Sequence, residues 1–112
     1  MPQMKNIKIK DRVIGQGFPP YIIAEISANH NGSIDAAKRL IEAAKRSGAD
    51  AVKLQTYTAD TITLDSEKAD FQINEGLWKG RTLYDLYDWA HTPWEWHQEL
   101  FTHAEKVGIT IF

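Results

Sequence analysis

The stretch AVKLQT at residues 51–56 decides how the chain folds. Val52 and Leu54 suit a strand that packs under helices. Lys53 and Gln55 alternate with them and therefore point to the other side of the same strand. A charged ammonium group in the middle of an otherwise apolar strand needs a reason, and the rest of the sequence supplies one.

A helix and a second strand precede this stretch. YIIAEIS at residues 21–27 reads as the strand, Ser33 is a good N-cap, and Gly48 is a good helix terminator. The apolar residues between the caps recur at helical spacing: Ile34, Ala37, Leu40, Ile41 and Ala44. A strand–helix–strand unit of about thirty residues predicts a parallel βαβ crossover.

Residues 57–91 read as a long excursion, in which TADTITLDSEKAD at residues 58–70 is polar and predicts irregular chain. GLWKG at residues 76–80 predicts a turn with an exposed Trp78. Thr82 can cap a short helix, whose apolar face would hold Leu83, Leu86, Tyr87 and Ala90.

A second long helix is predicted after the excursion. Thr92 and Glu95 have the spacing of a capping box, with Pro93 at the first helical position. Gly108 is expected to end this helix, whose apolar face would hold Trp96, Leu100, Phe101, Ala104 and Val107. ITIF at residues 109–112 predicts a third strand.

Residues 1–20 predict an N-terminal hairpin and a connector. IKIKDRVIG at residues 7–15 alternates around a polar turn at residues 10–12. GQGFPP then carries two of the three glycines of a dinucleotide fingerprint. Pro19 and Pro20 stand where the helix of that motif should begin, so a plain connector is the better interpretation.

Alternating strands and helices predict an α/β domain with a parallel sheet buried on both faces. A complete (β/α)8 TIM barrel takes roughly 250 residues. We therefore expect residues 1–112 to be the N-terminal part of such a barrel, truncated near its third strand.

The composition excludes several classes of function. Thirteen basic and fifteen acidic residues give a formal net charge of -2, which argues against a general affinity for nucleic acid or anionic membranes. The absence of cysteine excludes disulfides, thiolate metal sites and a cysteine nucleophile. Neither a secretory signal nor an apolar run long enough for a membrane span is visible, so a cytoplasmic protein is expected.

Strand alternation gathers polar residues on one side of the sheet. Glu25 and Ser27 share a side of the first strand, as Lys53 and Gln55 do of the second. All four lie toward the carboxyl ends of their strands, where barrel enzymes place their active sites. The same alternation pairs Thr110 with Phe112 on the third strand.

Two interpretations of Glu25 and Lys53 remain open at this stage. They could merely neutralise each other across adjacent strands, although a buried ion pair often adds no stability over apolar packing. Alternatively, Lys53 could hold an anionic substrate or form a Schiff base. The residue pattern does not decide whether Lys53 would hold an anionic substrate or form a Schiff base.

Other candidates carry weaker signals. Four histidines show no metal-ligand spacing, so no metal site is predicted in this chain. His30 differs because its loop, NHNG at residues 29–32, follows the first strand on the expected catalytic side. Aromatic residues of the second half could stack on sugars, but packing is the commoner role of such residues: Trp78, Tyr84, Tyr87, Trp89, Trp94 and Trp96.

Two blocks, IIAEISANHNGS at residues 22–33 and GADAVKLQTYTADTITL at residues 48–64, resemble the start of the sialic acid synthase family. The later stretch GLWKGRTLYDLYDWAHTPWEWHQELFTHAEKVGITIF is similar to the pseudaminic acid synthase branch in particular. The resemblance implies a (β/α)8 barrel followed by a small antifreeze-like domain, which this chain lacks, and a domain-swapped homodimer.

The resemblance also implies a reaction. These transferases condense phosphoenolpyruvate with an N-acetylated amino sugar and water, giving a nonulosonic acid and phosphate. For the pseudaminic branch the expected sugar is 2,4-diacetamido-2,4,6-trideoxy-L-altropyranose. A divalent metal, Mn²⁺ or Mg²⁺, is implied as cofactor, with ligands outside this chain, so the segment alone is expected to be inactive.

Site residues follow from the same resemblance. Lys53 would contact phosphoenolpyruvate with Thr110 beside it, and Glu25 would lie at the reacting end of the sugar. Gln55 and Phe112 would shape the pocket, and His30 would lie on the substrate side. This family activates its donor as an enol ester, which disfavours a Schiff base at Lys53. The alternatives are an N-acetylneuraminate or legionaminic acid synthase, or a non-catalytic sugar- or phosphate-binding fragment.

Overall fold

The computed structural model describes residues 4–112. Its elements comprise five strands, four α-helices and two 3₁₀ helices within this range. In chain order they are β1 (Ile7–Ile9), β2 (Arg12–Ile14), β3 (Ile23–Glu25), α1 (Ile34–Arg46), β4 (Ala51–Lys53), α2 (Ala59–Ile62), η1 (Ala69–Phe71), α3 (Leu83–Ala90), η2 (Trp94–Trp96), α4 (His97–Val107) and β5 (Thr110–Ile111).

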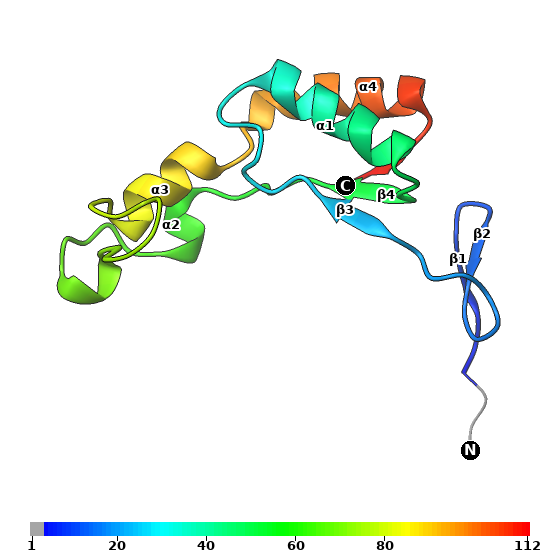
Figure 1. The fold of residues 1–112 in the computed structure, drawn as a ribbon, viewed down its shortest axis with the longest axis horizontal. Helices are drawn as coiled ribbons and strands as arrows, with labels where there is room; N and C mark the ends of the chain where they lie inside the picture. The colour runs from blue at the N-terminus through cyan, green and yellow to red at the C-terminus, as the bar shows by residue number, and fades with distance from the viewer. Residues whose placement is uncertain (1–3) are drawn as a thin grey trace.

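Strands β3, β4 and β5 form a parallel sheet in their chain order, with β4 in the centre. Helices α1 and α4 pack against each other and lie side by side over the same face of this sheet (Figure 1). Strands in sequential order with their helices on one side are the arrangement of a barrel wall, whereas doubly wound sheets carry helices on both faces. The α/β class with parallel strands is therefore confirmed.

One face of the sheet is buried and the other is open, contrary to the expectation that both faces are covered. Val52 is fully buried and Leu54 nearly so beneath the helices, whereas Ile23 on the opposite face is 44% exposed. The sequence pattern placed the aliphatic residues on the correct side. Among residues 4–112, no helix covers the side that bears Glu25 and Lys53.

The core lies between the sheet and the two long helices. Ile41 of α1 and Leu100 of α4 are its largest fully buried aliphatic residues. The rest of the buried cluster comes from both helices and the helix-facing side of the strands: Ile26, Ala37, Val52, Leu54, Ala104 and Ile109. Phe101 does not belong to this cluster and is 43% exposed, so its predicted place on the apolar face is wrong.

The caps of α1 and α3 follow the predictions. Ser33 accepts a hydrogen bond from the backbone N–H of Ala36, and Thr82 accepts one from the N–H of Asp85. The end of α4 is also as predicted, because Gly108 adopts a left-handed φ of 85° that glycine tolerates best.

The predicted capping box at Thr92 is absent. The Thr92 side chain is buried, its Oγ1 has no hydrogen-bond partner among the described residues, and its backbone N–H donates to Gln55 O at 3.0 Å. Pro93 is extended, with ψ of 137°, rather than helical. The chain forms η2 first, and α4 begins only at His97 without a side-chain cap. Docking of Thr92 against the segment that follows β4 therefore prevails over local capping.

The N-terminal hairpin is confirmed, with β1 and β2 antiparallel. Figure 1 shows it beyond the amino-terminal end of β3. Asp50, just before β4, joins the hairpin to the sheet by accepting from Arg12 Nη1 at 2.5 Å and from the backbone N–H of Ile22 at 2.8 Å. The Ile22 N–H and the Arg12 guanidinium hold the pKa of Asp50 below its ordinary value.

The excursion at residues 57–91 forms a lobe beyond the carboxyl-terminal end of β4, opposite the hairpin (Figure 1). Two short helices, α2 and η1, occur where the sequence predicted irregular chain. Trp78 is half-buried rather than exposed, because its ring packs on Trp89 with centroids 5.1 Å apart. Over residues 4–112, no helix has both the length and the apolar character that crossing a bilayer requires.

Candidate functional site

Glu25 and Lys53 end two adjacent parallel strands and lie directly opposite each other in register. Lys53 Nζ donates to Glu25 Oε1 at 3.2 Å, forming an ion pair. The Lys53 side chain is 49% exposed and that of Glu25 is 61% exposed. The pair expected from strand alternation is therefore present, but it faces solvent on the open side of the sheet instead of being buried.

A cavity of about 230 Å³ lies at this pair. We call it the lysine cavity; its lining consists of Glu25, Ser27, Lys53, Leu54 and Gln55. All four polar residues predicted to face one side of the first two strands thus meet in one place. Lys53 supplies the only cationic group of this lining within residues 4–112.

Ser27 follows β3 with a φ of 50°, in the left-handed region that non-glycine residues rarely adopt. Such backbone strain persists only where the surrounding structure imposes it, and it often accompanies binding sites. The turn brings Ser27 into the lining of the lysine cavity, next to Gln55.

Phe112 continues the row of Glu25 and Lys53 on the third strand. Its N–H donates to Val52 O at 3.1 Å and its carbonyl accepts from Leu54 N–H at 2.7 Å, so it lies beside Lys53. Thr110 pairs in register with Ala51, two residue positions nearer the start of the strands than Phe112 and Lys53. Thr110 lines a different cavity, near Lys10 and Asp50, so the structure does not bring it to the lysine cavity.

His30 is buried beneath its loop and lines neither the lysine cavity nor the open side of the sheet. Its side chain is 1% exposed, and Nδ1 accepts a hydrogen bond from the backbone N–H of Gly32 at 3.0 Å. Its ring packs edge-on against Trp96 with centroids 5.0 Å apart. Burial lowers the pKa of His30, and the nearby His91 lowers it further, so the neutral imidazole is favoured.

A second, larger cavity lies beside the lysine cavity and was not predicted. We call it the aromatic cavity; it has a volume of about 400 Å³, and Tyr57, Trp78, Tyr87 and Trp89 supply its rings. Ser27 and Gln55 line both cavities. The sequence held a signal for it, since the excursion is rich in Trp and Tyr, but helical packing explained those residues equally well.

Metal binding is not supported by these residues. No group of three His, Cys, Asp or Glu side chains within residues 4–112 is arranged to hold a metal ion. The carboxylate in the lysine cavity is already paired with an ammonium group. These residues therefore do not fit the metal ion that the resemblance implies.

Comparisons with known proteins show which family the chain resembles. A sequence model described as the NeuB family matches residues 40–112. The pseudaminic acid synthase of Campylobacter jejuni is 55% identical over 92 residues, covering 82% of this chain and 27% of that protein. The pseudaminic acid synthase of Helicobacter pylori is 52% identical over 94 residues, covering 84% of this chain and 28% of that protein. The chain thus spans little more than a quarter of the length of these relatives.

A solved structure is similar over almost the whole chain. It is the N-acetylneuraminic acid (sialic acid) synthetase of Leptospira borgpetersenii in complex with citrate. The TM-score is 0.74 at 25% sequence identity, covering 96% of this chain and 33% of that one. Together with the sequence match, this likeness shows that the chain belongs to the NeuB family.

Proposed function

We propose that this chain forms the start of a phosphoenolpyruvate-dependent nonulosonic acid synthase, and specifically of a pseudaminic acid synthase. The protein that carries this chain, with any residues that flank it, is called the whole protein below. Its proposed reaction joins phosphoenolpyruvate to 2,4-diacetamido-2,4,6-trideoxy-L-altropyranose. Identity to two pseudaminic acid synthases supports this acceptor over the sugars of the sialic and legionaminic acid synthases.

The ion pair of Lys53 and Glu25 is the observation that carries the proposal. The pair lies at the carboxyl ends of parallel strands, where (β/α)8 enzymes place their chemistry. An exposed pair of this kind adds little stability, so its position needs another explanation. A fixed ammonium group at this place can bind the phosphate or the carboxylate of phosphoenolpyruvate by charge-assisted hydrogen bonds.

The roles of the two charges differ. Lys53 would hold the anionic donor, and any loss of water from the site would strengthen that interaction. Glu25 would orient the acceptor sugar and accept or donate a proton at the hydroxyl that forms there. In the proposed reaction the enol carbon of the donor bonds to the aldehyde carbon of the sugar. Water then adds to the donor carbon that carries the phosphate, and phosphate leaves as its C–O bond breaks.

Neighbouring residues take supporting roles in this proposal. Gln55 lines the lysine cavity and Phe112 lies beside Lys53, so both can shape the donor pocket. Thr110 would need the completed pocket to reach the donor, since it lies level with Ala51, two residue positions before Lys53. The buried His30 is better suited to holding its loop, through the Gly32 N–H, than to contacting substrate.

Three further features of the family remain proposals for the whole protein. They are a divalent cation, Mn²⁺ or Mg²⁺, with ligands from residues other than these, a homodimeric assembly, and the EC class of a C–C bond-forming transferase. Metal analysis and sedimentation of the whole protein test the first two directly.

Release of inorganic phosphate tests the proposed reaction. The whole protein is incubated with phosphoenolpyruvate and, in separate reactions, with the acceptor sugars of the pseudaminic, sialic and legionaminic acid synthases. Phosphate release with the first sugar alone supports the proposal. Release with another sugar instead moves the protein to that branch, and no release with any sugar refutes synthase activity.

A further inference from the structure

Two segments join the excursion at residues 57–91 to the rest of the chain: residues 54–56 and residues 92–97, which we call the neck. The sheet does not hold the end of the first segment, because β4 stops at Lys53 and no strand within residues 4–112 pairs with Gln55 or Thr56. Gln55 nevertheless lines both the lysine cavity and the aromatic cavity. Contacts across the neck must therefore fix its position.

Two hydrogen bonds cross the neck. The backbone N–H of Thr92 donates to the carbonyl of Gln55 at 3.0 Å, and Thr56 Oγ1 lies 2.7 Å from His97 Nε2. Thr92 is buried, whereas Thr56 is exposed. The two bonds thus hold consecutive residues, Gln55 and Thr56, directly after the strand that carries Lys53.

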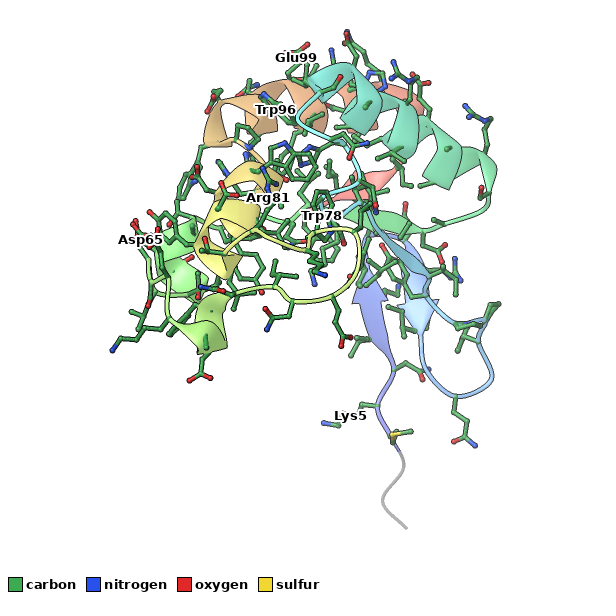
Figure 2. All side chains as sticks on the ribbon, turned by 60° about the vertical axis from the view of Figure 1, so that its left-hand side comes forward. Lys5, Asp65, Trp78, Arg81, Trp96 and Glu99 are labelled. Carbon is green, nitrogen blue, oxygen red and sulfur yellow. The ribbon has the colours of Figure 1, made fainter. Side chains whose placement is uncertain are left out.

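The histidine belongs to a rigid element. His97 is the first residue of α4, and Leu100, one turn later, is fully buried in the core. Figure 2 shows Trp96 and Glu99, which flank His97 in the chain, at the end of α4 that lies against α1. Thr56, by contrast, lies in a segment without helix or strand. The helix therefore positions the segment of Thr56.

A second contact sets the direction of the bond between His97 and Thr56. His97 Nδ1 lies 3.0 Å from the carbonyl oxygen of Trp94. A carbonyl oxygen can only accept, so Nδ1 carries a proton. In the neutral ring Nε2 is then an acceptor, and the hydroxyl of Thr56 donates to it.

We propose that His97 is a positioning residue for the synthase site: through Thr56 it closes the neck and holds Gln55 at the lysine cavity. This inference rests on the proposed function and adds a residue that lines neither cavity. Misplacement by about 1 Å of a group near the reacting atoms can cost up to roughly 100-fold in rate. Lys53 is held separately, by the register of β4 with β3, so a loosened neck should disturb Gln55 and leave the ammonium group in place.

Nitrogen NMR of the whole protein tests the contact without relying on turnover. We expect the neutral ring of His97 to be the Nδ1–H tautomer, which is the less populated form of a free histidine side chain. Thr56→Val removes the hydroxyl with little change of shape and should move the Nε2 resonance, whereas Thr56→Ser should leave it in place. An Nε2–H ring in the wild-type protein, or an unchanged Nε2 resonance in Thr56→Val, would overturn the proposal.

Kinetics test the positioning role. Thr56→Val and His97→Leu should each lower kcat/KM for the sugar by about threefold to tenfold, the range that one neutral hydrogen bond covers. The dissociation constant of phosphoenolpyruvate should change by less than about twofold, because Lys53 stays in the sheet. Thr56→Ser should keep wild-type kinetics. His103→Leu is the matched control, because His103 is also on α4 but pairs with Glu42 on α1 at 3.0 Å, away from the neck.

A double-mutant cycle assigns the effect to this one hydrogen bond. Thr56→Val should lower kcat/KM several-fold in the wild-type background and by less than about twofold in the His97→Leu background. Effects that simply multiply would show that the two residues act independently, which overturns the proposal.

The same measurements separate this inference from the proposed function. If phosphate is released and both single variants have wild-type kcat/KM, the positioning role fails and the synthase function stands. If no phosphate is released with any sugar although the nitrogen resonances show the contact with Thr56, the synthase function fails and the closure of the neck by His97 stands.

Discussion

Replacement of Lys53 by methionine should leave the fold almost unchanged. Methionine keeps most of the apolar stem and removes the ammonium group. The pair that is lost joins Lys53 Nζ to Glu25 Oε1 at 3.2 Å, with side chains that are 49% and 61% exposed. Exposed pairs contribute at most about 1 kcal/mol, so we expect urea titration to show a change in the free energy of unfolding no larger than that.

The same replacement should strongly weaken the binding of phosphoenolpyruvate. Loss of one charge-assisted contact to a desolvated anion typically costs about 2–5 kcal/mol, which corresponds to roughly 30-fold or more in affinity. Isothermal titration of the whole protein with phosphoenolpyruvate measures this dissociation constant. Lys38→Met is a matched control, since Lys38 also forms an ion pair, with Glu99, but joins α1 to α4 away from the lysine cavity.

The two measurements together decide the role of Lys53. A lysine that serves only the ion pair predicts a small loss of stability and unchanged binding. Wild-type affinity for phosphoenolpyruvate in Lys53→Met would refute the reasoning that places the donor at this strand end. A large loss of affinity in Lys38→Met as well would show that the effect is general electrostatics and not a local contact.

Three further predictions concern the stability of the chain. Because the pKa of His30 is lowered in the folded state, the unfolded state binds more protons below the ordinary histidine pKa of about 6.5. The free energy of unfolding should therefore fall as the pH drops through this value. Urea titrations should show a shallower fall for His30→Gln, and an identical fall would contradict the assignment. Gly108→Ala should lower the free energy of unfolding by about 1–2 kcal/mol, because alanine must adopt the φ of 85°; an unchanged midpoint would count against this cap. Thr82→Ala should lower the free energy of unfolding by about 1 kcal/mol, because the N-cap of α3 is lost. Thr92→Val should cost nothing or stabilise, because it removes a buried hydroxyl that has no hydrogen-bond partner among residues 4–112; a loss equal to that of Thr82→Ala would restore the predicted capping box.

Local rules predicted much of the fold. The apolar spacing of α1 and its cap at Ser33, the left-handed Gly108 and the antiparallel hairpin are all decided by neighbouring residues. The start of α4 was predicted wrongly because a long-range contact decides it. Thr92 donates its N–H to Gln55 O, 37 positions earlier in the chain, and the next residue, Pro93, has a ψ of 137° that is not helical.

Strand alternation predicted the part of the site that lies on the strands. Alternation assigned Glu25, Lys53 and Gln55 to one face, and the register of β3 and β4 brings the first two together. It could not predict that His30 turns into the core, because a loop has no fixed period. Strand alternation also could not predict the aromatic cavity, since Trp78 lies in a loop, where it contacts Arg81 and where backbone hydrogen bonds close the turn.

One face of the sheet is apolar and buried and the other is charged and exposed, and this difference bears on the lysine in AVKLQT. Val52 and Leu54 bury their side chains against α1 and α4, and this burial is a large source of stability for the sheet. Lys53 and Glu25 gain little from each other in solvent, so stability gives no reason to place both charges on adjacent strands. The proposed anionic donor gives that reason, because it would use the ammonium group that now pairs with Glu25 at 3.2 Å.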